Sequence, residues 1–174
     1  HRLADGTFSR EVTGDWPGEH SSPNSSGSIV WADDQTMGTM LLARMAPLFQ
    51  VREYAEEVTR QQRGFAKRLV DGSDGLSYHG YNEADGHVSC CKWGRGNGWG
   101  MLGHAEALAS MAAWPEGYPD AAANAQVRSI FQRHAAAAKA SQAGDGRWHQ
   151  LLNDTSDASS LETSATAVLL SALV

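Results

Sequence analysis

The sequence lacks the features that mark several large classes of protein. No apolar run approaches the roughly 20 residues that a membrane-spanning helix needs, and residues 165–174 are the longest candidate. The net charge is −6 and the basic residues form no cluster, so we expect neither nucleic acid nor a membrane as a partner. The glycine-rich stretch at 94–98 is not followed by Gly-Lys-Ser/Thr, which excludes a phosphate-binding loop.

Cysteine is also scarce, and its placement excludes further classes. The only two cysteines, Cys90 and Cys91, are neighbours. Adjacent cysteines rarely bond each other, so we expect no disulfide scaffold and no four-cysteine zinc site. His79 and His149 could form a metal pair, but their spacing matches no zinc signature. The sequence therefore predicts no metal and no cofactor.

The 174 residues, 41% of them hydrophobic, are enough for one domain with a sizeable core. The chain begins at His1 without Met and ends inside an apolar helical pattern. We expect residues 1–174 to be a single domain truncated at both ends. The cellular compartment, cytoplasmic or secreted, stays open, because this N-terminus is not informative and a targeting segment could precede it.

Apolar spacing predicts a mainly helical chain. Helices are expected over 34–46, 51–70, 98–113 and 120–141, and a last one is expected to start near Ser160. A capping box with Ser160 as N-cap is an alternative for this segment, but a poor one, because Thr163 would replace the usual Glu. Pro47 should end or kink the first, and Asp120 should cap the fourth. Residues 1–28 and 71–96 are expected to be loops, and no convincing strand alternation appears. This pattern favours a ring or solenoid of helical hairpins with long loops gathered at one end.

These loops and the helix starts that follow them combine tryptophan with polar side chains. The set is Trp16, Trp31, Trp93, Trp99, Trp148, Asp33, Asp34, His79, His87, His149, Arg95, Asn97 and Gln150. Indoles beside such groups are typical of a pocket that binds sugars. Simpler explanations stay open for each: the acids favour a helix N-terminus, the tryptophans pack under loops, and the glycines serve backbone geometry.

Four segments in order give the chain a family resemblance. They are VWADDQTMGTMLLARMA (30–46), DGLSYHGYNE (74–83), WGRGNGW (93–99) and GRWHQLLNDTSDASSLETSATA (146–167), and DGTFSR (5–10) also fits. The sequence resembles the unsaturated glycuronyl hydrolases of glycoside hydrolase families 88 and 105, especially the unsaturated rhamnogalacturonyl hydrolases. The resemblance implies an all-α (α/α)6 barrel, six helical hairpins in a ring, here a partial barrel forming a single catalytic domain. A second family aspartate is expected upstream of this sequence.

The resemblance also implies a reaction. The substrate is an unsaturated uronyl oligosaccharide made by a lyase, with a C4=C5 enol ether in the terminal uronic acid. An acid protonates C4, water adds at C5, the hemiketal opens and the remaining sugar leaves. One carboxyl serves as acid and then as base. The resemblance assigns that role to Asp33, with Asp34 as the alternative, and we expect an acidic to near-neutral optimum.

The remaining site residues are assigned to substrate binding. Arg95 is expected to grip the uronate carboxylate, with Thr163 and Ser164 as weaker donors. His79 is expected to bond the sugar, and Met37 to line the pocket one turn after Asp33. Trp93, Trp99 and Trp148 are candidates for stacking on sugar rings, and Gln150 is a candidate for hydrogen bonding to the substrate. The alternatives are a non-catalytic sugar-binding relative, another (α/α)6 sugar enzyme such as an epimerase, and a purely structural toroid.

Overall fold

A computed structural model describes residues 1–13, 27–115, 117–118, 120–154, 156 and 159–174. Trp16 lies outside these described residues. The helices are α1 (Ala32–Met37), α2 (Met40–Phe49), α3 (Arg52–Leu69), α4 (Gly94–Ala112), α5 (Ala121–Ala140) and α6 (Thr163–Leu173). The strands are β1 (Arg10–Val12), β2 (Gly27–Trp31) and β3 (Gly80–Asn82).

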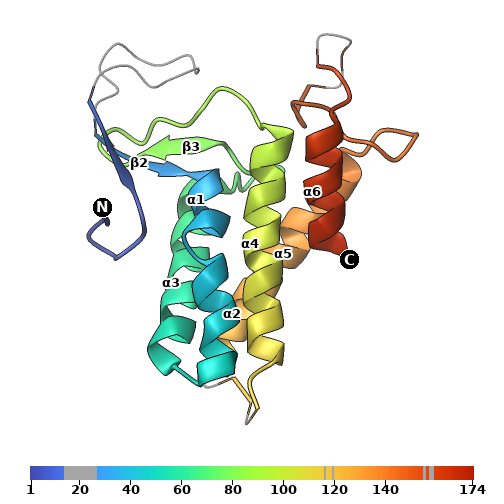
Figure 1. The fold of residues 1–174 in the computed structure, drawn as a ribbon. Coiled ribbons are helices and arrows are strands. Elements are labelled where there is room, and N and C mark those ends of the chain that lie inside the picture. Colours follow the sequence, from blue (N-terminus) through green and yellow to red (C-terminus); the bar gives the residue numbers. More distant parts are fainter. Residues whose placement is uncertain (14–26, 116, 119, 155, 157–158) are drawn as a thin grey trace.

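The helices form two layers (Figure 1). In the front layer, α4 packs between α1–α2 on one side and α6 on the other. In the rear layer, α3 packs against α2 and α5 packs against α4. From α2 to α6, successive helices therefore alternate between the layers, as hairpins of a helical ring do. The loops before α4 and α6 lie at the same end of the helices as the start of α1 (Figure 1).

Helix packing rests on small and apolar side chains between the layers. Met101, Trp148 and Leu169 form one buried cluster with their neighbours. Val30 and Phe65 belong to a second cluster beneath the strands. Gly98 explains how α4 and α6 come so close, because a Cβ there would lie 2.1 Å from Cγ1 of Val168. A larger residue at this position would force the two helices apart.

Several predicted boundaries are confirmed and others are corrected. The helix predicted over 51–70 is α3, and Asp120 caps α5 by accepting a hydrogen bond from the backbone N–H of Ala123 at 2.9 Å. The helix predicted over 34–46 is instead two helices interrupted at residues 38–39, and Pro47 lies inside α2. The last helix begins at Thr163, because the Glu162 side chain, not Ser160, bonds its first free N–H groups.

A small antiparallel sheet was not predicted. Its strand order is β1-β2-β3, with Trp31 paired to Gly80. The strands hold only three to five residues. Stretches this short are too brief for alternation of apolar and polar residues to be detected in the sequence. The predicted loops over 1–28 and 71–96 therefore contain strands that tie the loop end of the molecule together.

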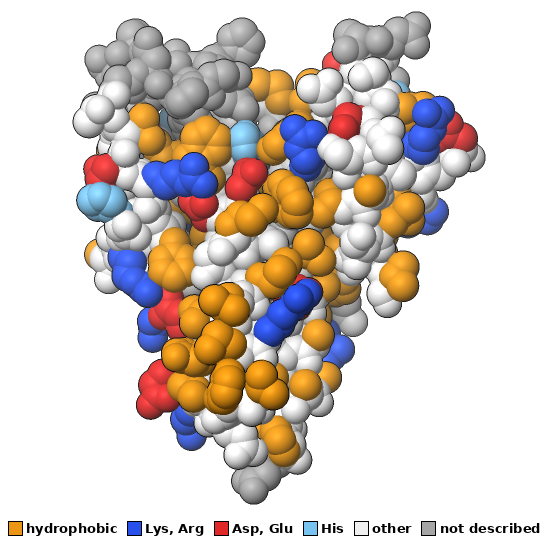
Figure 2. Space-filling model, in the orientation of Figure 1, with side chains coloured by type: hydrophobic (Ala, Val, Ile, Leu, Met, Phe, Trp, Pro, Cys, Tyr) orange, Lys and Arg blue, Asp and Glu red, His pale blue; other side chains and the backbone are white. Residues whose placement is uncertain are grey.

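The front face of the helical layer carries exposed apolar side chains. Figure 2 shows these side chains gathered over α2. Met37, Leu41, Leu48 and Phe49 from α1 and α2 are all exposed. In the part of the chain that the structure describes, no helix is both long and apolar enough to cross a membrane.

Candidate active site

The small sheet positions the start of α1 against the loop that carries His79. Because Trp31 pairs with Gly80 across β2 and β3, the residues that follow and precede them also meet. The backbone N–H of Ala32 donates to the carbonyl of His79 at 2.8 Å. Asp33 is the next residue, so the sheet places its carboxyl beside the His79 ring.

Asp33 and His79 are joined directly. Nε2 of His79 lies 3.0 Å from Oδ2 of Asp33, and the side chains keep 15% and 29% of their surface exposed respectively. Because a carboxylate oxygen only accepts, Nε2 is the donor. Burial raises the pKa of Asp33, but the hydrogen bond and charge of His79, helped by the charge of Arg10, outweigh it and lower that pKa overall. The carboxyl of the unliganded site is therefore ionised at neutral pH.

The neighbouring acid, Asp34, faces a different partner. Arg10 on β1 donates through Nε to Asp34 Oδ2 at 2.8 Å and through Nη2 to Oδ1. The Arg10 guanidinium also lies over the Trp31 ring, 5.8 Å from its centroid. Consecutive residues of a helix point about 100° apart, which explains why the two acids have separate partners.

His79 is held between two indoles. Its ring centroid lies 4.7 Å from that of Trp31 and 4.7 Å from that of Trp93. Gly96, on the first turn of α4, leaves room for this arrangement, because a Cβ there would lie 3.1 Å from the Trp93 ring. The glycines of 94–98 thus lie inside a helix that other groups approach closely, and α4 begins at Gly94 instead of the predicted Gly98.

Arg95 continues the row of side chains toward α6. Its guanidinium lies over the Trp93 ring, 4.2 Å from the centroid, and Nη1 donates to Oγ of Ser164 at 2.7 Å. The Glu162 carboxylate lies 3.7 Å away. Burial raises the pKa of Glu162, but hydrogen bonds from Ser164 and Ala165, with the Arg95 charge, lower it overall. An anionic group is thus already present beside Arg95.

Five predicted residues are therefore linked by direct contacts. They run in the order Asp33, His79, Trp93, Arg95, Ser164. Two further contributors, Arg10 and Glu162, were missed. Both lie in segments that carried the family resemblance, DGTFSR and LETSATA, but neither was given a role there. The pairing of Arg10 with Asp34 depends on the unpredicted sheet. Glu162 is the N-cap of α6, a role that the sequence does not indicate because Glu is not one of the preferred N-cap residues.

Four other predicted residues make no side-chain contact with these five among the contacts that the structure describes. Met37, one turn after Asp33, is 61% exposed. Trp99 is half-buried on α4, where its carbonyl accepts from the Thr36 hydroxyl. Gln150 and Thr163 are exposed at the loop end. Their assignment to substrate binding stays a prediction.

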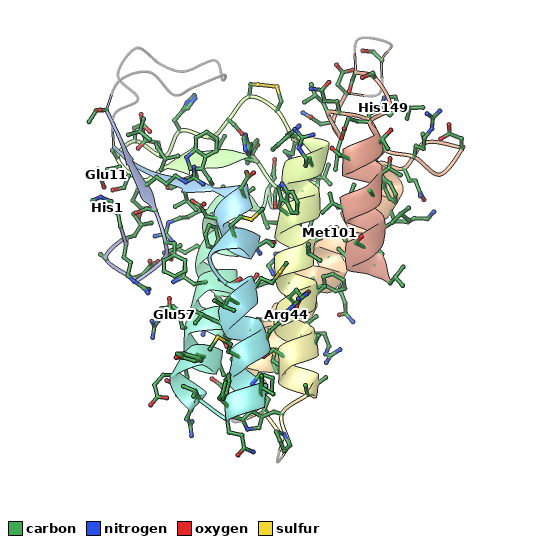
Figure 3. All side chains as sticks on the ribbon, in the orientation of Figure 1. His1, Glu11, Arg44, Glu57, Met101 and His149 are labelled. Carbon is green, nitrogen blue, oxygen red and sulfur yellow. A yellow bond between two sulfur atoms is a disulfide. The ribbon has the colours of Figure 1, made fainter. Side chains whose placement is uncertain are left out.

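Trp148 is in a different environment from the one predicted. Its side chain is only 1% exposed, its Nε1 donates to the carbonyl of Ala138 at 2.7 Å, and it belongs to the core cluster with Met101. A sugar therefore has no ring face to stack on, and the stacking prediction for Trp148 is wrong. Its neighbour His149 lies in the loop near the start of α6 (Figure 3), where its Nδ1 bonds the carbonyl of Ser159.

The expectation for the cysteines is also corrected. Cys90 and Cys91 form a disulfide with each other, visible in the loop before α4 (Figure 3). Because the chain holds only these two cysteines, an intramolecular bond can join only these neighbours. Among the residues that the structure describes, no group of three or more His, Cys, Asp or Glu side chains is placed to hold a metal ion.

Known proteins share this architecture. The chain is 31% identical over 148 residues to the unsaturated rhamnogalacturonyl hydrolase YesR of Bacillus subtilis, a match that covers 83% of this chain and 40% of YesR. A crystal structure of a possible GH105 family member from Klebsiella pneumoniae superposes with a TM-score of 0.79 at 28% identity, covering 99% of this chain and 42% of that one.

A more distant structure is the unsaturated glucuronyl hydrolase of Bacillus sp. GL1, responsible for the degradation of glycosaminoglycan. It matches with a TM-score of 0.65 at 19% identity, over 91% of this chain and 41% of that one. These likenesses confirm the predicted fold, part of an (α/α)6 barrel. The chain spans about two fifths of the length of each of these proteins.

The family model for Glycosyl Hydrolase Family 88 matches residues 1–174, the whole sequence. The predicted resemblance to families 88 and 105 is thereby confirmed, because the family model, the YesR match and the structural likeness agree. The chain belongs to Glycosyl Hydrolase Family 88.

Proposed function

We propose that the protein is a glycoside hydrolase that removes an unsaturated uronic acid from the non-reducing end of lyase-generated oligosaccharides. The single observation that carries this proposal is the Asp33 carboxyl, hydrogen-bonded to His79 at 3.0 Å beside two indoles. A carboxyl that can move one proton is what hydration of an enol ether requires. YesR and the glucuronyl hydrolase, which the chain resembles, are named for unsaturated uronyl substrates.

In the proposed reaction, Asp33 gives its proton to C4 of the C4=C5 double bond, and positive charge develops at C5 and the ring oxygen. Water adds its oxygen at C5 while the Asp33 carboxylate takes up the proton that this water releases. The resulting hemiketal opens to a C5 ketone, C1 becomes a hemiacetal, and the second sugar leaves with a free hydroxyl. The balance is the addition of one water molecule.

The ionised resting state of Asp33 sets a condition on this reaction. A group that protonates carbon must first hold a proton, whereas His79 lowers the pKa of Asp33 in the unliganded site. A bound uronate brings a second negative charge and excludes water, and both effects raise the pKa of a nearby carboxyl. We therefore assign to substrate binding the step that loads Asp33 with its proton.

Arg95 is the proposed partner of the uronate carboxylate. A guanidinium can donate two parallel hydrogen bonds to a carboxylate. Stacking on Trp93 and the bond to Ser164 fix the orientation of the Arg95 guanidinium. The Ser164 hydroxyl also donates to Glu162. Trp93 is then placed to pack against a sugar face, and Met37 and Trp99 are the further candidates for the pocket wall.

The test compares unsaturated and saturated disaccharides as substrates of the complete natural protein. The enol ether absorbs in the ultraviolet, so its loss reports hydration. We expect the absorbance to fall, and the product formed in D2O to carry one deuterium at C4 when it is trapped before the new C5 ketone exchanges its C4 hydrogens. Equal cleavage of the saturated disaccharide would overturn the hydration mechanism. Binding without any loss of absorbance would instead establish the sugar-binding alternative.

A further inference from the structure

Asn97 lies at the centre of a buried hydrogen-bond cluster next to the candidate site. It belongs to the WGRGNGW segment, one helical turn after Trp93, and its side chain is fully buried on α4. It is not placed to meet a ligand. Its contacts are instead with the loop that carries His79, with Trp93, and with a second buried side chain, His134 of α5.

The first contact fixes the chain two residues before His79. Oδ1 of Asn97 accepts from the backbone N–H of Ser77 at 2.7 Å, and Nδ2 donates to the carbonyl of the same residue at 2.9 Å. One amide group thus satisfies both backbone groups of Ser77, as a neighbouring strand would. Paired bonds of this kind set both the position and the rotation of the peptide.

The second contact fixes the residue against which the His79 ring packs. Nδ2 of Asn97 also donates to the carbonyl of Trp93 at 2.9 Å, and the Asn97 backbone N–H reaches the same oxygen at 3.0 Å. Asn97 therefore holds both sides of the contact between His79 and Trp93. The backbone of His79 is held by a further bond, since its N–H donates to Oγ of Ser89 at 2.9 Å.

The third contact orients the amide itself. Nε2 of His134 lies 2.9 Å from Oδ1 of Asn97, and His134 is fully buried. Since Oδ1 is an acceptor, His134 carries its proton on Nε2 and presents Nδ1 as a lone pair. Burial lowers the pKa of His134 to about 4, so the ring is neutral and carries a single ring proton. The bond prevents the Asn97 amide from turning over.

We propose that Asn97 and His134 are positioning residues that hold the His79 imidazole at hydrogen-bonding distance from Asp33. The inference rests on the proposed function for its effect on catalysis, but not for the orientation of His79. The path is His134 to Asn97, Asn97 to the Ser77 backbone, and from there along the chain to His79. Catalytic geometry of this kind is lost when a group moves by about 1 Å.

The first experiment observes His79 directly, without substrate. The complete natural protein is labelled with ¹⁵N-histidine, and the ring signals of His79 are assigned by their absence in His79→Phe. We expect Asn97→Leu to shift or broaden these signals, because the Ser77 peptide loses its anchor. We expect the same of His134→Leu, because the Asn97 amide loses the bond that orients it. His134→Gln retains a donor near the position of Nε2, and it should restore them.

The second experiment measures turnover in the same variants. Asn97→Leu should lower kcat by about 100-fold and change KM by less than that, because the pair Asp33 and His79 is misaligned. The backbone N–H of residue 97 still bonds the Trp93 carbonyl, which retains the surface under Arg95. His134→Leu should lower kcat by about tenfold, and His134→Gln should recover most of that loss. If Asn97→Leu does not fold, the comparison of His134→Leu with His134→Gln still tests the proposal.

Thr59→Val provides the matched control. Thr59 is buried on α3, where its hydroxyl bonds the carbonyl of Ala55 and the Tyr118 hydroxyl, and it makes no described contact with the Asn97 cluster. It should lower stability without moving the His79 signals or kcat. Unchanged His79 signals in His134→Leu would overturn the proposal, and so would shifted signals with unchanged kcat. A wild-type protein that leaves the chromophore intact would defeat the proposed function alone, since the ring signals still report the orientation.

Discussion

The Asp33 carboxylate accepts a hydrogen bond from Nε2 of His79 at 3.0 Å, and the imidazole lies between the indoles of Trp31 and Trp93. This arrangement ties the proposed acid to a group on another loop. It also fixes the protonation state of the resting site, because the hydrogen bond lowers the pKa of Asp33 although burial raises it.

Replacing His79 with Phe should raise the pKa of Asp33. Phe keeps a ring between the two indoles but removes the donor, so burial is no longer opposed by His79. NMR titration of ¹³C-labelled aspartate, assigned with Asp33→Asn, measures the change. The higher pKa favours the protonated carboxyl, but we still expect kcat to fall by about 10²-fold, because Asp33 loses the hydrogen bond that orients it. An unchanged or lower pKa in the variant would contradict this role of His79.

The same shift makes stability depend on pH. A carboxyl whose folded-state pKa is lowered stabilises the protein above its unfolded pKa of about 3.9, and that contribution is lost as pH falls through the folded pKa. The free energy of unfolding of the wild type should therefore fall more steeply below about pH 4 than that of His79→Phe. Urea unfolding at a series of pH values tests this difference, and parallel curves would contradict it.

Replacing Arg95 with Lys should weaken substrate binding. Lysine keeps the charge but loses the planar stacking on Trp93 and the ability to donate two parallel bonds to a carboxylate. A lost charge-assisted bond of about 1.5–3 kcal/mol corresponds to a rise in KM of roughly 10- to 150-fold. Steady-state kinetics measures the change. An unaltered KM would place the uronate elsewhere, and Arg147→Lys, at an exposed ion pair with Asp145, is the matched control.

Truncation of Trp148 to Ala should lower stability, whereas truncation of Trp93 to Ala should weaken substrate binding. Trp148 is in the core, so Trp148→Ala should lower the free energy of unfolding by about 3–5 kcal/mol with KM unaffected in the folded fraction. Trp93→Ala removes the surface under Arg95 and beside His79, and should raise KM by about tenfold, or about 1.4 kcal/mol. Denaturant unfolding and kinetics on both variants separate the two roles, and a KM effect from Trp148→Ala alone would reverse the assignment.

Replacing Gly98 with Ala should destabilise the contact between α4 and α6. The new Cβ would lie 2.1 Å from Cγ1 of Val168, and overpacking of this kind typically costs about 1–3 kcal/mol. Val168→Ala removes the opposing methyl groups, so the double variant should recover part of the loss. Urea unfolding of the four proteins forms the cycle. Strictly additive losses would show that the two side chains do not meet.

Much of the helical framework could be predicted from the sequence. The helix of α3 was found because its apolar positions recur on one side, and α5 because Asp120 is a good cap before a long helix-forming run. The start of α4 was predicted too late. Gly94 and Gly96 suggest a loop, and only the close approach of the His149 carbonyl and the Trp93 ring to them shows why these positions are glycine within a helix.

The site was predicted in part. Asp33, His79 and Arg95 could be named as candidates because they share loops or helix starts with tryptophans, and their roles follow from the resemblance to families 88 and 105. The partner of Asp34 and the cap of α6 could not be predicted. Arg10 reaches Asp34 only because the sheet forms, and Glu162 acts on backbone N–H groups. Trp148 was misplaced because a loop position in the sequence gives no sign that its ring packs inward.

The most direct measurement of the central claim compares Asp33→Asn with Asp34→Asn in the complete natural protein. An unsaturated disaccharide is mixed with excess enzyme, and the loss of the enol ether absorbance is followed in a single turnover. Asp33→Asn should slow this loss by at least about 10²- to 10⁴-fold, because the proton donor is gone. Asp34→Asn, which only weakens the ion pair with Arg10, should remain within about tenfold of the wild type. A fast Asp33→Asn variant, or the reverse order of the two, would contradict the account.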